Sequence, residues 1–138
     1  MTRIKLQNSY DLARARAQSL AADAIRSIET DGVADTGATT LAIPEEVAAY
    51  LGLPDVGRCR IRLADGRIRT FRVAGDLVVE ILGRRMSLDA VVLPVGTTIL
   101  IGQIVLAALD LVVDAKSGDV SANPEHPEGP LLEALSAA

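Results

Sequence analysis

Residues 33–40 read Val33-Ala34-Asp35-Thr36-Gly37-Ala38-Thr39-Thr40, which places one carboxylate on a tight turn directly after an apolar strand. A second segment, Thr98-Ile99-Leu100-Ile101-Gly102, follows about sixty residues later and can supply the apolar wall that such a turn needs. An Asp-Thr-Gly triplet alone is a weak signal, because these residues form turns in many proteins. The two segments together are a more specific signal than the triplet alone. The order of the predicted strands and helices around them can support or weaken that signal.

The segments before the turn alternate between strand and helix patterns. Arg3 to Asn8 alternates polar with apolar residues, which indicates a strand. Ser9 to about Ala24 is rich in Ala and Arg and contains neither Gly nor Pro, which predicts a helix. Ile25 to Ala34 returns to alternation and should enter Asp35 as a strand, with a bulge or kink at Asp31-Gly32.

The segments after the turn predict a short helix and a hairpin. Pro44 to Leu51 begins with Pro and two acids, as helix N-termini often do. Arg58 to Leu63 and Arg67 to Ala74 should pair as strands across the turn Ala64-Asp65-Gly66. The alternation is imperfect around Thr70, which predicts a bulge there.

The second half of the chain continues with short strands. Asp76 to Leu82 and Arg85 to Leu93 predict a second hairpin, and a short helix from about Gln103 should lead into a strand from Leu109 to Asp114. This order describes one mostly-β domain that closes partly on itself. We divide the chain into an N-terminal strand and helix extension (1–24), the domain (25–122) and a Pro/Glu-rich tail (123–138). In that tail, Leu131 to Leu135 is either a short docking helix or a frayed end.

Composition narrows the possible functions. The net charge is −4 and the pI about 4.9, which argues against a chain that mainly neutralises phosphates. Cys59 is the only cysteine and His126 the only histidine, so we expect no disulfide, no metal centre and no cofactor. The first residues are too polar for a signal peptide and no apolar run has membrane-spanning length, so we expect a cytoplasmic protein without membrane contact.

The Asp35 turn and the segment Ile99 to Gly102 resemble the active-site signature of retropepsin-like aspartic proteases. That family's Asp-Thr/Ser-Gly-Ala turn and its later apolar-apolar-Gly segment both match without substitution. The resemblance covers roughly Ile25 to Val120 and is to the small stand-alone prokaryotic members. It implies a retropepsin-like closed β-barrel, the acid protease fold, with one or two short helices in a homodimer.

The resemblance also implies roles for individual residues. Asp35 corresponds to the catalytic carboxylate, Thr36 to the hydroxyl that braces two turns across a dimer, and Gly37 to the residue whose N–H faces the carboxylate. Ala38 has to stay small beside the substrate. The packing of four later residues is implied to support the turn: Ile99, Leu100, Ile101 and Gly102.

A flap over the substrate is implied at the first hairpin. The residues in its position are Ala64, Asp65, Gly66 and Arg67, and the Gly lets the tip open and close. No Trp or Tyr lies near this tip. The segment from Met1 to Ala24 exceeds what a minimal viral subunit requires, and it either covers the sheet or blocks the cleft.

The single Asp-Thr-Gly turn predicts a dimer on chemical grounds. Peptide hydrolysis by carboxylates needs one group to take a proton from water and another to give a proton to the carbonyl oxygen or the amine. One Asp35 per chain cannot do both, so we expect a symmetric homodimer in which the two copies meet on the two-fold axis. The sequence thus predicts an aspartic endopeptidase that acts on polypeptides.

Other interpretations remain open at this stage. One alternative is a catalytically inactive dimerisation or peptide-binding module of the same fold. Another is an RNA or acidic-partner binder that uses the arginine-rich hairpins, although a solvated strand face explains the arginines more simply and stacking aromatics are scarce, so we expect no nucleic acid. We also expect solvated carboxylates at Asp110, Asp114 and Asp119, and a small buried side chain at Cys59.

Overall fold

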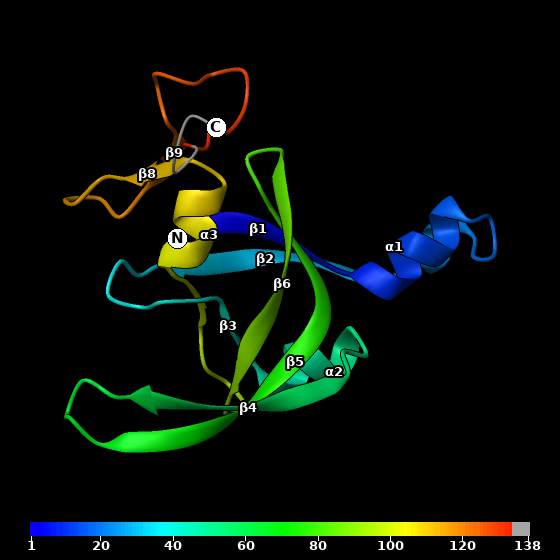
Figure 1. Cartoon of the computed structure of the whole chain (residues 1–138), viewed down its shortest axis with the longest axis horizontal. Coiled ribbons are helices and arrows are strands. Elements are labelled where there is room, and N and C mark those ends of the chain that lie inside the picture. Colours follow the sequence, from blue (N-terminus) through cyan, green and yellow to red (C-terminus); the bar gives the residue numbers. More distant parts are fainter. Residues whose placement is uncertain (134–138) are drawn as a thin grey trace, which may run out of the picture.

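The protein, seen in a computed structural model that describes residues 1–133, is mostly β (Figure 1). Its elements follow in the order β1 (Thr2–Asn8), α1 (Ser9–Arg16), the 3₁₀ turn η1 (Ala22–Ala24), β2 (Ser27–Ala34), β3 (Ala42–Pro44), α2 (Glu45–Tyr50), β4 (Asp55–Arg62), β5 (Ile68–Ile81), β6 (Arg84–Leu93), β7 (Ile99–Ile101), α3 (Gln103–Ala108), β8 (Leu111–Val113) and β9 (Val120–Ala122).

Six strands close into a barrel. The strand order is β1-β2-β7-β3-β6-β5, and β5 pairs back onto β1 to close the ring, while β4 extends the outer half of β5 as a hairpin. The expected mostly-β closed barrel is therefore confirmed, and the described residues form three short α-helices where one or two were expected. Closure pairs the edge of β1 with β5, and β4 remains as an edge strand outside the ring.

The barrel interior is aliphatic. Several aliphatic side chains have no exposure to solvent, among them Leu6, Leu41, Ile43, Val79 and Ile101. Phe71 is the one buried aromatic residue of the described chain, because Tyr10 and Tyr50 remain 59% and 64% exposed. None of the helices in the described part is long and apolar enough to cross a membrane.

The first residues of the chain form part of the barrel wall. β1 pairs antiparallel with β2 on one side, where Leu6 lies opposite Ile28, and with β5 on the other, where Leu6 lies opposite Val79. Leu6 is fully buried as a result. β1 therefore closes the barrel by pairing with β2 on one side and with β5 on the other.

The predicted helix from Ser9 to Ala24 is wrong in length. α1 ends at Arg16, and Gln18 adopts a left-handed conformation with φ of 60°. The Gln18 N–H donates to the Ala15 carbonyl and the Ser19 N–H to the Arg14 carbonyl, which is the Schellman pattern of helix ends. The chain must reverse here to bring β2 back alongside β1, and helix propensity alone does not encode that reversal.

Both predicted bulges are also wrong in position. The β1–β2 register is regular through Asp31 and Gly32, and the β4–β5 register is regular through Thr70. The irregularities lie instead between Asp55 and Gly57 and between Ala74 and Leu77. The second one bends β5 where that strand leaves the hairpin and enters the barrel.

A buried carboxylate ties α1 to the start of β2. Asp11 accepts hydrogen bonds from the Arg26 backbone N–H at 3.0 Å and from Arg26 Nε and Nη2 at 2.8 and 3.0 Å. Asn8 caps the same helix by accepting the Asp11 N–H at 3.0 Å, and its amide donates to the Leu51 carbonyl at 2.9 Å. The helix is thus held to the barrel by polar contacts.

This contact predicts an acid-sensitive contribution to stability. The side-chain hydrogen bonds from Arg26 lower the pKa of Asp11 from 3.8 to about 2. Because the folded-state pKa is below that of the unfolded chain, the stabilisation is fully present above about pH 4 and is lost as the pH falls through about 2. We expect Asp11→Asn to lower the free energy of unfolding at neutral pH and to flatten its dependence on pH in this window.

Urea unfolding at a series of pH values measures this effect. Asp23→Asn is the matched control, since Asp23 is exposed on η1 and forms no ion pair with any described residue. An Asp11→Asn protein with the same slope as the parent between about pH 2 and pH 4 would contradict the assignment.

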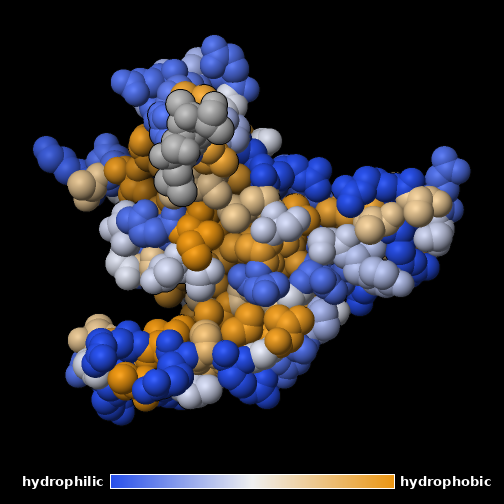
Figure 2. Space-filling view, viewed as in Figure 1, coloured by the Kyte–Doolittle hydropathy of each residue, from blue (hydrophilic) through white to orange (hydrophobic). Residues whose placement is uncertain are grey.

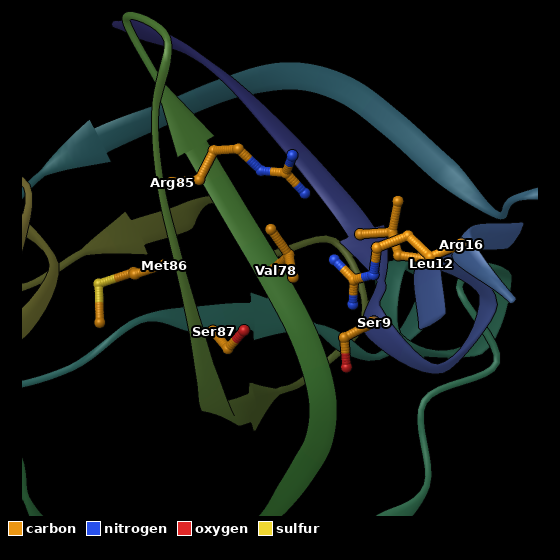
Figure 3. A pocket seen from close by; sticks show the side chains of 7 residues that line it. All are labelled: Ser9, Leu12, Arg16, Val78, Arg85, Met86 and Ser87. Atoms are coloured by element: carbon orange, nitrogen blue, oxygen red, sulfur yellow. The ribbon is translucent and has the colours of Figure 1, made fainter. Parts of the chain in front are cut away.

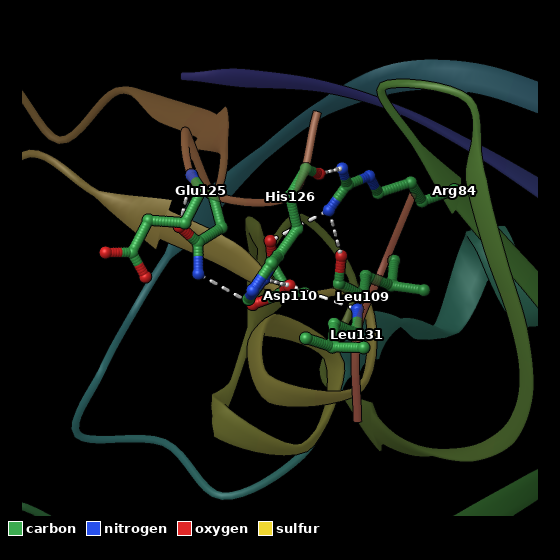
Figure 4. Close-up of polar contacts among 7 residues, drawn as sticks. Arg84, Leu109, Asp110, Glu125, His126 and Leu131 are labelled. Carbon is green, nitrogen blue, oxygen red and sulfur yellow. Dashed lines mark hydrogen bonds and ion pairs between the residues drawn. The ribbon is translucent and has the colours of Figure 1, made fainter. Parts of the chain in front are cut away.

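A second polar network holds the segment after β9 (Figure 4). The buried Arg84 donates to the carbonyls of Leu109, Asp110 and His126. Asp110 accepts from Asn123 Nδ2 at 3.1 Å and from the Leu131 N–H at 3.1 Å, and its Oδ2 lies 2.5 Å from His126 Nδ1.

The expectation that Asp110 is simply solvated is therefore wrong. Hydrogen bonds from Asn123 and from the Leu131 backbone lower its pKa to about 2. Leu131 has no regular secondary structure, and the part of the predicted tail helix beyond residue 133 lies outside the described residues. The sequence signal could not reveal this network, because Arg84 and His126 are far from Asp110 along the chain.

Candidate active site

Asp35 lies at the end of β2, on the turn that leads to β3. Its backbone N–H donates to the Ile101 carbonyl at 2.9 Å, so the turn begins attached to β7. Its carboxylate Oδ1 accepts the Gly37 N–H at 2.9 Å, and the Ala38 N–H closes the turn on the Asp35 carbonyl at 3.0 Å. The side chain is half-buried, so one oxygen is held by the backbone while the group stays accessible.

The start of α3 fixes the other side of the turn. The Gln103 N–H donates to the Ala38 carbonyl and the Ile104 N–H to the Thr39 carbonyl, both at 2.9 Å. These are the first N–H groups of the helix, which have no partner inside it. Gln103 Nε2 also donates to the Thr36 carbonyl at 3.1 Å. The first residues of α3 therefore hold the turn from Thr36 to Thr39.

Strand β7 carries this helix into position. It runs parallel to β2, with Val33 opposite Leu100 and Ala34 opposite Ile101, and it pairs on its other edge with β3. The chain thus leaves β2, makes the Asp35 turn into β3, and later returns to insert β7 between these two strands. The structure brings Asp35, Thr36, Gly37 and Ala38 together with Ile99, Leu100, Ile101 and Gly102, as the sequence predicted.

Gly102 is required by the closeness of the two segments. A Cβ at this position would lie 2.4 Å from the Thr40 carbonyl oxygen and 2.8 Å from the Ala38 carbonyl oxygen. Its φ of −94° and ψ of −175° are open to any residue, so the requirement is one of space. Gly32 is similarly confined, with a Cβ placed 3.2 Å from Ile101 Cδ1. Gly32 is therefore explained by the close approach of β2 to β7. The bulge that the sequence predicted at this position is not needed to explain it.

The predicted flap residues lie at the tip of the β4–β5 hairpin, which projects on the same side as the Asp35 turn (Figure 1). Asp65 accepts the Arg67 N–H at 2.9 Å and pairs with Arg67 Nε at 2.6 Å, and Gly66 has φ of 87°. Ala64 to Arg67 are all exposed. In the space-filling view an open notch separates this hairpin from the rest of the barrel (Figure 2).

A second apolar cluster joins the hairpin to the strands beside Asp35. Phe71, Ala42 and Val91 form its buried centre. Partly buried side chains pack around them, namely Cys59, Ile61, Leu63, Leu93 and Leu100. Cys59 is thus half-buried against Phe71. One wall of the notch is therefore apolar, and it runs from the hairpin to Leu100, next to Ile101.

Two hollows in the described surface lie away from Asp35. One of about 180 Å³ is lined by α1, β5 and β6 through Ser9, Leu12, Arg16, Val78, Arg85, Met86 and Ser87 (Figure 3). The other lies over the tail segment from His126 to Leu131. Neither includes a residue of the Asp35 turn.

Asp114 and Asp119 are both exposed, and both take part in the turn between β8 and β9. Asp114 accepts the N–H groups of Lys116 and Ser117, and the Asp119 N–H donates to the Ser117 hydroxyl. Within residues 1–133 no group of three or more His, Cys, Asp or Glu side chains could hold a metal ion.

Sequence reasoning missed the role of Gln103, whose backbone and side chain both bind the turn. The available signal was its place directly after Gly102, where a helix N-terminus offers free N–H groups. The hairpin arginines were also expected on one solvated strand face, whereas the β4–β5 register places Arg69 on the face of Phe71 and Arg60 on the opposite face.

Comparison with known proteins agrees with this geometry. A family model described as aspartyl protease, from the retropepsin-like clan, matches residues 24–105, which is more than half of the chain. The match includes the Asp35 turn, the β4–β5 hairpin, β7 and the start of α3. No curated protein matches the chain. The chain therefore belongs to an aspartyl protease family of the retropepsin-like clan.

Proposed function

We propose that the protein is a homodimeric aspartic endopeptidase in which Asp35 of each subunit contributes one carboxylate to a shared site. The observation that carries the proposal is the Asp35 turn, an accessible carboxylate on a turn fixed from both sides by β7 and α3. The family match supports peptide hydrolysis in general.

A second subunit is needed because one chain supplies one catalytic carboxylate and the reaction requires two. The sequence contains a single Asp-Thr-Gly turn. Val33 and Ile104, which flank the turn, are 38% and 46% exposed, so a partner that covered them would remove apolar surface from water. The Thr36 side chain is exposed and makes no hydrogen bond to the described residues, which leaves its hydroxyl free to brace the partner's turn.

The two carboxylates would divide the acid and base roles. Two carboxylates about 3 Å apart cannot both ionise cheaply, so the pair retains one proton. The ionised member takes a proton from water while the protonated member hydrogen-bonds the scissile carbonyl oxygen, and the water oxygen attacks the carbon. The C–N bond then breaks as the amine gains a proton, which yields a new carboxyl and a new amino terminus. The Gly37 N–H keeps one oxygen fixed during these transfers.

The flap would supply the walls of the cleft. An extended substrate can pair with exposed backbone groups near the hairpin tip as an added strand, and Ala64 to Arg67 would close over it. The aliphatic wall from Ile61 to Leu100 would receive apolar side chains. Neither a metal ion nor a cofactor takes part in this mechanism.

Cleavage of unstructured peptides as a function of pH tests the proposal. We expect cleavage to be greatest in mildly acidic solution and to fall as the shared proton is lost toward alkaline pH. A transition-state mimic of aspartic proteases should block it. Peptide binding without cleavage at any pH would instead favour the inactive-module alternative, and a rate that is flat from acid to alkaline pH would contradict the paired-carboxylate mechanism.

A further inference from the structure

The flap hairpin has a charge opposite to that of the whole chain. Residues 55–72 contain six of the chain's twelve arginines and two aspartates, which gives +4 in a chain whose net charge is −4. The rest of the chain therefore has a net charge of −8. A basic hairpin that closes over a cleft in an acidic protein raises the local concentration of acidic chains.

The β4–β5 register separates these arginines into two faces. Residues that lie opposite each other in an antiparallel pair point to the same side. Arg69 lies opposite Ile61, on the face that includes Phe71, whereas Arg60 lies opposite Thr70 on the other face. The first face packs toward Ala42 and Leu100, so it is the face beside the notch. Figure 2 shows the apolar surface of the hairpin bordered by hydrophilic residues.

Arg69 is held in place without being neutralised. Its guanidinium carbon lies 5.4 Å from the centre of the Phe71 ring, a cation–π arrangement that orients the group and leaves its N–H edge free. Three neighbouring arginines of the hairpin are paired, in the contacts Arg58–Asp55, Arg67–Asp65 and Arg72–Glu45. Arg69 has no ion pair or side-chain hydrogen bond among residues 1–133.

We propose that Arg69 is a specificity-determining residue that binds an acidic side chain of the substrate, so that the preferred substrates are polypeptide segments in which Glu or Asp accompanies apolar residues. This inference rests on the proposed function of the same cleft. The guanidinium donates charge-assisted hydrogen bonds to the substrate carboxylate, and the wall formed by Ile61, Leu63 and Phe71 receives the apolar neighbours.

Paired peptides test this role. Peptides that the protein cleaves are synthesised with Glu or Gln at each position around the scissile bond, and kcat/KM is measured for both members. We expect the wild-type protein to prefer Glu at one position on the order of tenfold, and Arg69→Gln to abolish that preference mainly through KM. Arg69→Lys should retain part of it.

Arg60→Gln is the matched control, because it removes the same charge from the same hairpin on the opposite face. It should leave the Glu/Gln ratio unchanged. Equal loss in both variants would mean that the hairpin acts only through its overall charge, and this result would overturn the role of Arg69.

The test separates this inference from the proposed function. If the wild-type protein cleaves Glu and Gln peptides equally at every position, the inference fails while the endopeptidase stands. If no peptide is cleaved, binding of the same pairs is measured by fluorescence anisotropy. Tighter binding of the Glu peptide that depends on Arg69 would then uphold the inference without catalysis, and equal binding would overturn it.

Discussion

Replacing Asp35 by Asn should lower kcat/KM for peptide cleavage by roughly a thousandfold or more, since the site would lose a group that accepts and returns a proton. The fold should persist. Among residues 1–133 the carboxylate accepts one hydrogen bond, from the Gly37 N–H at 2.9 Å, and an Asn carbonyl oxygen can accept the same bond. Circular dichroism and sedimentation should therefore give a folded dimer with unchanged spectra.

Asp31→Asn is the matched control for this experiment. Asp31 lies on the same strand, is exposed, and pairs loosely with Arg3 at 3.8 Å. Its replacement should leave the rate of cleavage unchanged. Retained activity in Asp35→Asn, or equal losses in both variants, would remove Asp35 from the mechanism.

Gly102→Ala should damage stability and activity together. The new methyl group would lie 2.4 and 2.7 Å from the backbone oxygen and nitrogen of Thr40, and neither atom can rotate away as a side chain could. Overpacking of this kind costs about 1–3 kcal/mol, and the displaced turn would carry Asp35 out of position. A shift on the order of 1 Å can lower the rate by about a hundredfold.

Gly118→Ala separates crowding from the general cost of replacing a glycine. Gly118 has φ of 76°, and no atom of the described residues lies within 4 Å of the added Cβ, so backbone strain opposes the change. We expect that variant to lose about 1 kcal/mol of stability and no catalytic rate. Thermal unfolding and kcat/KM, measured on both variants, would contradict the account if Gly102→Ala behaved like Gly118→Ala.

The local patterns in the sequence predicted most of the barrel because they depend on neighbouring residues. Strand alternation identified β1 and the two hairpins, and the turn residues identified the tip of the β4–β5 hairpin and the Asp35 turn. The apolar segment before Gly102 identified β7. Each of these signals is set by periodicity or turn chemistry within a few residues.

The errors came from features that distant residues decide. The end of α1 depends on where β2 has to return, and the bend at Gly75 in β5 depends on pairing with β4, β6 and β1 at once. The network around Asp110 needs Arg84 and His126, and the face of Arg69 needs the register with β4. Such relations appear only when the strands are placed in three dimensions.

Each active site should take one Asp35 from each of two subunits, and mixing wild-type with variant subunits measures whether it does. Wild-type and Asp35→Asn subunits are combined at fixed total concentration, unfolded, refolded together and assayed for cleavage. If both carboxylates are required, an equal mixture should retain about one quarter of the wild-type rate, because only dimers of two wild-type subunits are active. A rate of about one half, proportional to the wild-type fraction, would mean that each chain acts alone and would contradict the account.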